Sequence, residues 1–243
     1  MRLTRVHVDG PLSSGERVLV KGAAANHIMR VLRLRAGDAL TLFNGRGGEF
    51  AGSVEEFRRD SVLVGVHDAR SVDRESPLSL TLAQGISRGE RMDWILQKAT
   101  ELGASRIVPL FTERSVVRLD PKQAERKLHH WRAIAVAACE QSGRNRVPEV
   151  ALPQGFHDFV ADSEPQPTRL LLSPTGATGI DQLPAAGAGV TVLIGPEGGL
   201  TEVEQESALR AGFTPVRIGP RVLRTETAAI AALTIIQQKF GDL

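Results

Sequence analysis

The feature that most constrains the fold is an alternation of short apolar runs with helix-like segments between residues 78 and 240. The run Leu78 to Ala83 comes first, and Arg91 to Leu102 follows it with apolar residues at helical spacing and Gly103 as a stop. Strands joined by helices form parallel sheets, because a parallel connection needs a long crossover. The alternation therefore predicts an α/β domain with a parallel sheet.

Signals for helix ends sharpen the later part of this pattern. Asp120 and Pro121 suit the N-cap and first residue of a long helix, which Gly143 ends. Thr201 and Glu204 fit a capping box at the start of another helix. Beyond these we expect strands over 107–110, 169–172, 190–194 and 216–218, helices over 201–211 and 225–240, and surface connections over 153–168 and 174–189.

Residues 1–72 are predicted to be mainly β-structure. Polar and apolar residues alternate over 5–8, 17–20, 39–43 and 61–66, with turn-forming residues between these stretches. Many short strands with frequent turns indicate a small barrel, although Ala24 to Leu34 has the spacing of a short helix. The polar segment Ser71 to Pro77 is expected to join this first domain, residues 1–72, to a second, residues 73–243.

Two turns rich in Gly and Pro follow apolar runs in the last third of the chain, at Ile194 to Leu200 and at Ile218 to Leu223. Ligands of α/β sheets bind at the carboxyl ends of the strands, so the two turns could converge on one pocket. The first turn has neither the dinucleotide fingerprint nor a P-loop, and Glu197 between its glycines would repel a phosphate. A cationic or neutral ligand therefore fits better.

These turns, with the motif Leu223 to Ala228 after them, closely resemble the SPOUT-class RNA methyltransferases. Within that class they are similar to the family that forms 3-methyluridine in small-subunit (16S) ribosomal RNA. The resemblance covers nearly the whole chain. It implies a trefoil-knotted (SPOUT) parallel-sheet domain, an N-terminal PUA-like β-barrel and a homodimer. Nothing in the periodicity hints at the knot, since knots are nearly absent from proteins in general.

The resemblance also implies S-adenosyl-L-methionine as the cofactor, which fits a turn unsuited to phosphate. Three loops are then expected to enclose its adenosine with backbone groups and apolar side chains. Their expected cofactor-binding residues are Leu172, Ser173, Gly195, Pro196, Glu197, Gly198, Ile218, Gly219 and Leu223.

Arg224 and Glu226 are the candidates for the chemistry. Methylation at N3 of uracil requires the imide proton to leave while negative charge spreads onto O2 and O4. We assign Arg224 to charge stabilisation and positioning, whereas Glu226 could be the base or could only hold Arg224. The alternative for both is a structural ion pair at the start of the last helix, where Glu favours the helix dipole.

Residues 1–148 carry 24 Lys or Arg against 17 Asp or Glu, which suggests a polyanion partner. His27, Arg30 and Arg33 match the RNA-binding signature of the family's first domain, and Lys98, Arg114 and Arg144 match its other motifs. All six are therefore expected to contact RNA. The alternative is a solvated basic surface, on which Lys98 would simply pair with Glu101.

Composition excludes several other classes. The single cysteine, Cys139, rules out an internal disulfide, and it is expected to be a buried filler rather than a nucleophile. The six histidines show no metal-ligand spacing, so no metal is expected. No secretory h-region and no apolar run of about 18 residues is present, which favours a cytoplasmic protein without a membrane span.

Three alternatives remain for the function. A SPOUT ribose 2′-O-methyltransferase is disfavoured because such relatives usually carry Ser-Leu-Asn-Val-Ser where this chain has Leu223 to Thr227. A non-catalytic RNA-binding ribosome-assembly protein is disfavoured by the intact cofactor loops. A Rossmann-type oxidoreductase is disfavoured by the missing fingerprint.

Overall fold

The computed structural model describes residues 4–162, 168–176, 178–183, 187 and 189–243. Residues 163–167, 177, 184–186 and 188, within the two predicted surface connections, lie outside the described residues. The chain divides into two compact units. The first comprises Met1–Glu75 and Val136–Val147, and the second comprises Ser76–Ala135 and Pro148–Leu243.

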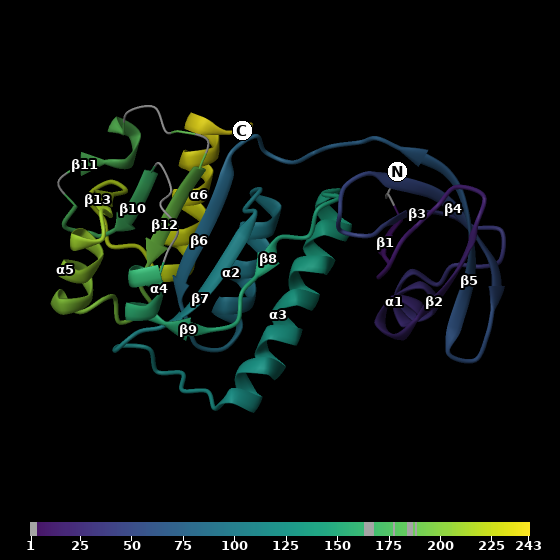
Figure 1. Ribbon diagram of the computed structural model, residues 1–243, viewed down its shortest axis with the longest axis horizontal. Coiled ribbons are helices and arrows are strands. Elements are labelled where there is room, and N and C mark those ends of the chain that lie inside the picture. The colour runs from purple at the N-terminus through teal and green to yellow at the C-terminus, as the bar shows by residue number, and fades with distance from the viewer. Residues whose placement is uncertain (1–3, 163–167, 177, 184–186, 188) are drawn as a thin grey trace. The chain divides into compact units, whose positions relative to one another are not determined.

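The first unit contains a curled five-stranded sheet in the order β1-β3-β4-β5-β2 (Figure 1). β1 pairs with β3 in parallel, and the other pairs are antiparallel. Apolar residues at alternate positions of the strands form its core, together with Ala25 and Ile28 from the helical segment. The elements are β1 (Arg5–His7), β2 (Arg17–Lys21), α1 (Gly22–Asn26), the wider π-helical segment η1 (His27–Leu32), β3 (Ala39–Phe43), β4 (Glu49–Phe57) and β5 (Ser61–Arg70).

The predicted strands and the predicted short helix of this unit are confirmed, but the sequence did not predict β4. Its second half carries Glu55 and Glu56 side by side at exposed positions, so the alternation of polar and apolar residues breaks down. The register between β4 and β5 also shifts twice, between Phe50 and Gly52 and between Val54 and Glu56. Such irregularities curve a sheet and blur its period of two.

An ion-pair cluster around the buried residues Arg5 and Glu49 completes the first unit. The guanidinium of Arg5 donates to Glu49 Oε2 at 2.6 Å and to Asn145 Oδ1 at 2.5 Å, and Arg74 donates to the same Glu49 oxygen at 3.1 Å. Burial alone would raise the pKa of Glu49, but the hydrogen bonds from both arginines outweigh it and lower that pKa. Because Asn145 follows helix α3 (Pro121–Ser142), a segment far along the chain supplies part of this unit's core.

The second unit is built on an eight-stranded sheet in which the strands described pair in parallel. The strand order is β11-β13-β10-β12-β6-β7-β8, and β9 also pairs with β7. This confirms the predicted parallel-sheet domain. The strands are β6 (Ser79–Gly85), β7 (Arg106–Phe111), β8 (Glu149–Val150), β9 (Gln154–Gly155), β10 (Thr168–Leu172), β11 (Thr178–Gly179), β12 (Gly189–Ile194) and β13 (Thr214–Arg217).

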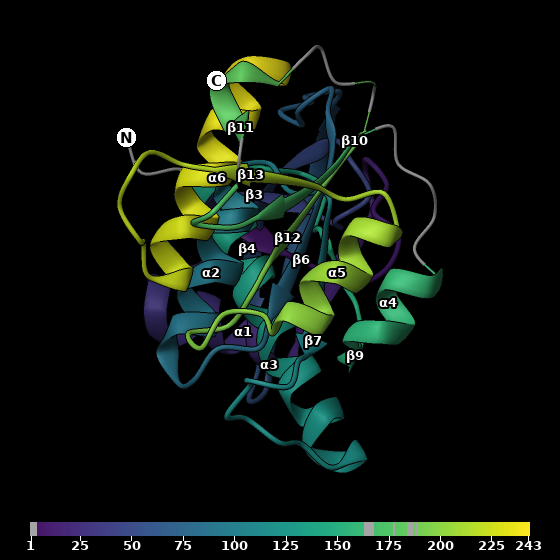
Figure 2. The same cartoon turned by 90° about the vertical axis from the view of Figure 1, so that its left-hand side faces the viewer.

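Helices cover both faces of this sheet (Figure 2). α2 (Glu90–Glu101) packs against α6 (Thr225–Phe240) on one side, and α4 (Phe156–Asp162) packs with α5 (Glu202–Arg210) on the other. The predicted capping box is present, with both Thr201 and Glu204 making the reciprocal bonds. The short helix η2 (Ile180–Gln182) lies near α6. Throughout the described ranges, no helix is long and apolar enough to cross a membrane.

The expectation of a surface connection over 153–168 is wrong for α4. Phe156, Phe159 and Val160 are buried and pack against sheet residues such as Val108 and Leu171. The apolar spacing in this stretch covers only two turns and is surrounded by Pro and Gly, so it falls below the length at which a helix is recognisable. Packing on the sheet, rather than helix propensity, stabilises such a short helix.

Candidate active site

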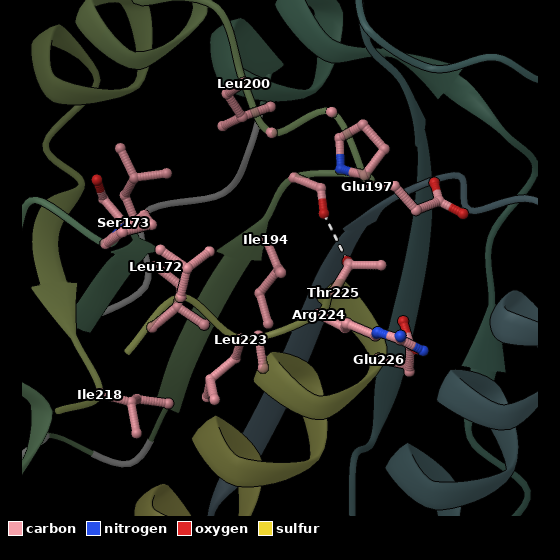
Figure 3. Close-up of a pocket in the computed structure, with 18 of the residues that line it drawn as sticks. Leu172, Ser173, Ile194, Glu197, Leu200, Ile218, Leu223, Arg224, Thr225 and Glu226 are labelled. Carbon is pink, nitrogen blue, oxygen red and sulfur yellow. Dashed lines mark hydrogen bonds between the residues drawn. The ribbon is translucent and has the colours of Figure 1, made fainter. Parts of the chain in front are cut away.

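A cavity of about 650 Å³ lies in the second unit, where strands β10 and β12 and the segment after β13 end. Because β10 pairs in parallel with both β12 and β13, their carboxyl ends meet at one edge of the sheet. Figure 3 shows Leu172 and Ser173 from the end of β10, Ile194 from β12, and Ile218 and Leu223 from the segment after β13 around this space. All nine residues predicted to bind the cofactor line the cavity, as do Arg224 and Glu226.

Glycines allow the turn after β12 to close on itself and to approach β6. The Gly199 N–H donates to Pro196 O at 2.9 Å, and Gly199 has φ +68°, a conformation that favours glycine. A Cβ at Gly85, at the end of the adjacent β6, would stand 2.5 Å from Pro196 Cδ. The turn therefore fits against β6 only because residue 85 has no side chain.

A buried amide and a hydroxyl fix the turn to its neighbouring elements. Gln84 is fully buried on β6, and its Nε2 lies 3.2 Å from Gly195 O and 3.0 Å from Thr225 Oγ1. Thr225 Oγ1, at the start of α6, donates to Gly195 O at 2.7 Å, the dashed line in Figure 3. The carbonyl of Gly195 thus links the first turn of α6 to the cofactor-loop candidate.

Glu197 is held by the segment that joins β6 to α2 and by the first turn of α2. Its Oε1 accepts hydrogen bonds from the Arg88 N–H at 2.9 Å and from Arg91 Nη1 at 2.8 Å. Burial alone would raise the pKa of Glu197, but these bonds outweigh it and lower that pKa. A carboxylate is therefore present on the cavity wall at neutral pH.

Arg224 and Glu226 do not form the ion pair considered from the sequence. In the described part of the chain, the nearest cation to the Glu226 carboxylate is Arg91, whose Nε lies 3.9 Å from Oε1. The other oxygen, Oε2, is buried without a hydrogen-bond partner. Arg224 is the N-cap residue of α6 and is exposed. The idea that Glu226 only holds Arg224 is therefore wrong for this structure, while the catalytic roles of both stay predictions.

Two of the predicted RNA-binding residues lie in the second unit. Lys98 pairs with Glu101 at 2.8 Å, which is the pairing expected if Lys98 belongs only to a solvated surface. Arg114 lines the cavity and donates to the carbonyls of Gly198 and Leu200 at 3.1 and 3.4 Å. Both contacts are structural, and a role in RNA binding remains a prediction for each.

The other four candidates lie in the first unit. Arg30 and Arg33 are exposed, and His27 lies 3.9 Å from Glu140. Arg144 is different, because its side chain is only 5% exposed and it donates to Glu75 through Nε and Nη2. That geometry favours a structural role for Arg144, whereas Arg30 and Arg33 have the accessibility that an RNA contact needs.

The sequence missed Gln84 and Arg91. Both become site residues only because β6 lies beside β12, which no local pattern reveals. Arg91 did carry one signal, since it lies at the start of a helix that follows a predicted strand. Helix starts in parallel α/β sheets face the carboxyl edge, where ligands bind.

Cys139 and metal-ligand geometry bear on other chemistries. Cys139 is fully buried, and burial, acting as the main cause, raises its pKa to about 12. A thiol so placed is neutral and inaccessible, which fits a structural filler. Among the described residues, no group of three or more His, Cys, Asp or Glu could hold a metal ion.

Comparison with known families gives two matches. Residues 74–237 match a family model described as an RNA methyltransferase domain, and residues 20–66 match one described as an RNA methyltransferase PUA domain. A relative from Buchnera aphidicola (subsp. Schizaphis graminum), named Ribosomal RNA small subunit methyltransferase E, is 34% identical over 242 residues, covering 100% of this chain and 98% of its own. The protein of that name from Bacillus subtilis is 36% identical and covers 89% of this chain and 88% of its own.

Two solved structures are similar over almost the full length. A methyltransferase from Legionella pneumophila in complex with bound SAM has a TM-score of 0.97 and 41% identity, and the similarity covers 100% of both chains. The Ribosomal RNA small subunit methyltransferase E from Neisseria gonorrhoeae, bound to S-adenosyl methionine, has a TM-score of 0.91 and 37% identity, with 99% of both chains covered.

Proposed function

The chain belongs to the RNA methyltransferase family, and on that premise we propose that it methylates N3 of a uridine in small-subunit ribosomal RNA with S-adenosylmethionine as donor. The observation that carries the proposal is the single cavity whose wall contains all nine residues expected for the cofactor and both residues expected for the chemistry. The relatives' names and the cofactor in the similar structures support the same reading.

The residues present fit the cofactor. A cavity of about 650 Å³ is within the usual range for cofactor sites. Leu172, Ile218 and Leu223 offer apolar surface for an adenine ring. The Glu197 and Glu226 carboxylates complement a ligand that carries a sulfonium and an ammonium group. When bound, S-adenosylmethionine would supply an electrophilic methyl group.

The chain's own residues would orient the base and handle its charge and proton. The exposed guanidinium of Arg224 can donate to a uracil carbonyl oxygen and stabilise the negative charge that spreads there. Glu226 has one carboxylate oxygen without a partner, so it can accept the N3 proton. Arg91, close to the other oxygen, would keep the carboxylate in place.

The finer architecture is also part of the proposal. The curled sheet, with the family match over 20–66, supports a PUA-like barrel in an RNA-binding domain of residues 1–72, followed by a trefoil-knotted domain of residues 73–243. The half-exposed Ile230 and Ile235 on α6 suit a homodimer interface. A ribosomal RNA substrate also implies a cytoplasmic location.

The decisive experiment incubates small-subunit ribosomal RNA, free or in purified subunits, with the protein and isotope-labelled S-adenosylmethionine, followed by mass spectrometry of the nucleosides. We expect label in 3-methyluridine. Label in a 2′-O-methylated nucleoside would establish the ribose methyltransferase instead. Calorimetry with S-adenosylmethionine distinguishes the enzyme from a non-catalytic RNA-binding protein, because a protein without affinity for the donor would produce no heat of binding.

A further inference from the structure

Four arginines line the cavity, and two of them are engaged by the protein itself. Arg91 bonds to Glu197 and lies close to Glu226. Arg114 donates to two backbone carbonyls of the turn after β12. Both guanidinium groups therefore donate hydrogen bonds to the cavity wall itself.

The other two, Arg221 and Arg224, differ from this pair. Both are exposed, and neither side chain makes a hydrogen bond or ion pair with any residue that the structure describes. Val222 between them is 80% exposed, while Leu223 is half-buried on the cavity wall. The loop is thus anchored by Leu223 and presents its two cations to solvent at the rim of the cavity.

These two cations lie in a part of the chain that is acidic as a whole. Residues 149–243 hold six Lys or Arg against 11 Asp or Glu, yet three of the six lie within Arg217 to Arg224. Of the three, Arg217 donates to Gly176 O at 3.2 Å. Although the region is acidic, none of these three arginines pairs with a carboxylate among the described residues. Such a loop is suited to an anionic ligand from outside the chain.

We propose that Arg221 binds a backbone phosphate of the substrate RNA next to the nucleotide that enters the cavity. Arg224 faces the base, and Arg221 holds the strand beside it. A guanidinium binds phosphate through two parallel hydrogen bonds, and such a contact fixes register without reading sequence. The RNA would then contact the second unit through Arg221 as well as the first unit through the exposed residues Arg30 and Arg33.

This inference rests on the proposed function, and its test keeps the two apart. Binding of in vitro transcribed small-subunit ribosomal RNA is measured by filter binding for the wild type, Arg221→Gln and Arg221→Lys over a series of salt concentrations. Arg210→Gln is the matched control, because it removes the same charge from an exposed arginine on α5 that pairs with Glu206. Calorimetry with S-adenosylmethionine is run on each protein.

We expect Arg221→Gln to reduce the slope of log affinity against log salt by about 0.7 to 0.9, the effect of one lost phosphate contact. At 0.1 M salt this corresponds to roughly sixfold weaker binding relative to the wild type. Arg221→Lys and Arg210→Gln should keep the wild-type slope, and all variants should keep the wild-type donor affinity.

Two results would overturn the assignment. An unchanged slope in Arg221→Gln, or an equal change in the control, would mean that Arg221 meets no phosphate. Weaker donor binding in Arg221→Gln would assign the guanidinium to the cofactor's carboxylate instead. Failure of the proposed function looks different, since the wild type itself would then transfer no methyl group.

Discussion

Substitution of Gly85 by alanine tests how tightly the cofactor turn is fitted to the sheet. The new Cβ would lie 2.5 Å from both Cδ and N of Pro196 and 3.0 Å from the Gly195 carbonyl carbon. Ordinary contacts begin near 3.4 Å, so the Gly195–Pro196 peptide must move by about 1 Å. Overpacking of this kind costs about 1–3 kcal/mol.

Because the displaced peptide forms the cavity wall, we expect this cost to weaken binding of S-adenosylmethionine by roughly 5- to 150-fold. Isothermal titration calorimetry measures the affinity, and urea unfolding of the free protein measures stability. Gly212→Ala is the control, since Gly212 has φ +85° with open space around it and lies beyond α5. That variant should lose about 1–2 kcal/mol of stability with donor affinity intact. Donor affinity of Gly85→Ala within twofold of the wild type would refute the reasoning.

Three further predictions concern single residues. Arg224→Ala should lower kcat by about 10²–10³-fold while donor affinity by calorimetry changes little, since its role is to stabilise charge that develops during transfer; equal losses in both would contradict that role. The lowered pKa of Glu49 stabilises the fold above pH 4.5, and this stability is lost as pH falls through the folded-state pKa. Urea unfolding of Glu49→Gln should accordingly show a weaker acid dependence than the wild type below pH 4.5, and identical pH profiles would argue against it. Cys139, whose pKa is raised to about 12, should resist iodoacetamide at pH 8 in the native protein and react after unfolding in urea, and equal rates in both states would be incompatible with its burial.

Local signals in the sequence predicted most elements of the fold. Pro121, the pair Thr201 and Glu204, and Gly103 mark helix ends through interactions within a few residues, and the structure has helix ends at each. Strand β4 and helix α4 were missed because their stability comes from partners elsewhere. The order of strands in the sheet depends on contacts between distant segments, so the local spacing of apolar residues does not predict it.

The candidate site divides in the same way. Its glycine-containing turns could be recognised because their backbone demands specific residue types. Gln84 and Arg91 could not, since an amide in a strand and an arginine on a helix are ordinary until β6 is known to lie beside β12. The pairing of Arg144 with Glu75 was likewise hidden, because an arginine in a basic motif looks the same whether it is buried or exposed.

The first unit is discontinuous in the chain, and this limits how the protein can be dissected. A fragment ending at residue 72 would keep the Arg5–Glu49 pair but would leave Arg5 without Asn145 and Glu49 without Arg74, so this buried pair would lose part of its hydrogen bonding. Transplanting the N-terminal module onto a related enzyme would then require two segments, the second being the tail of α3 and the residues to Val147. Hybrids that exchange only the leading stretch should misfold unless both parents share that tail.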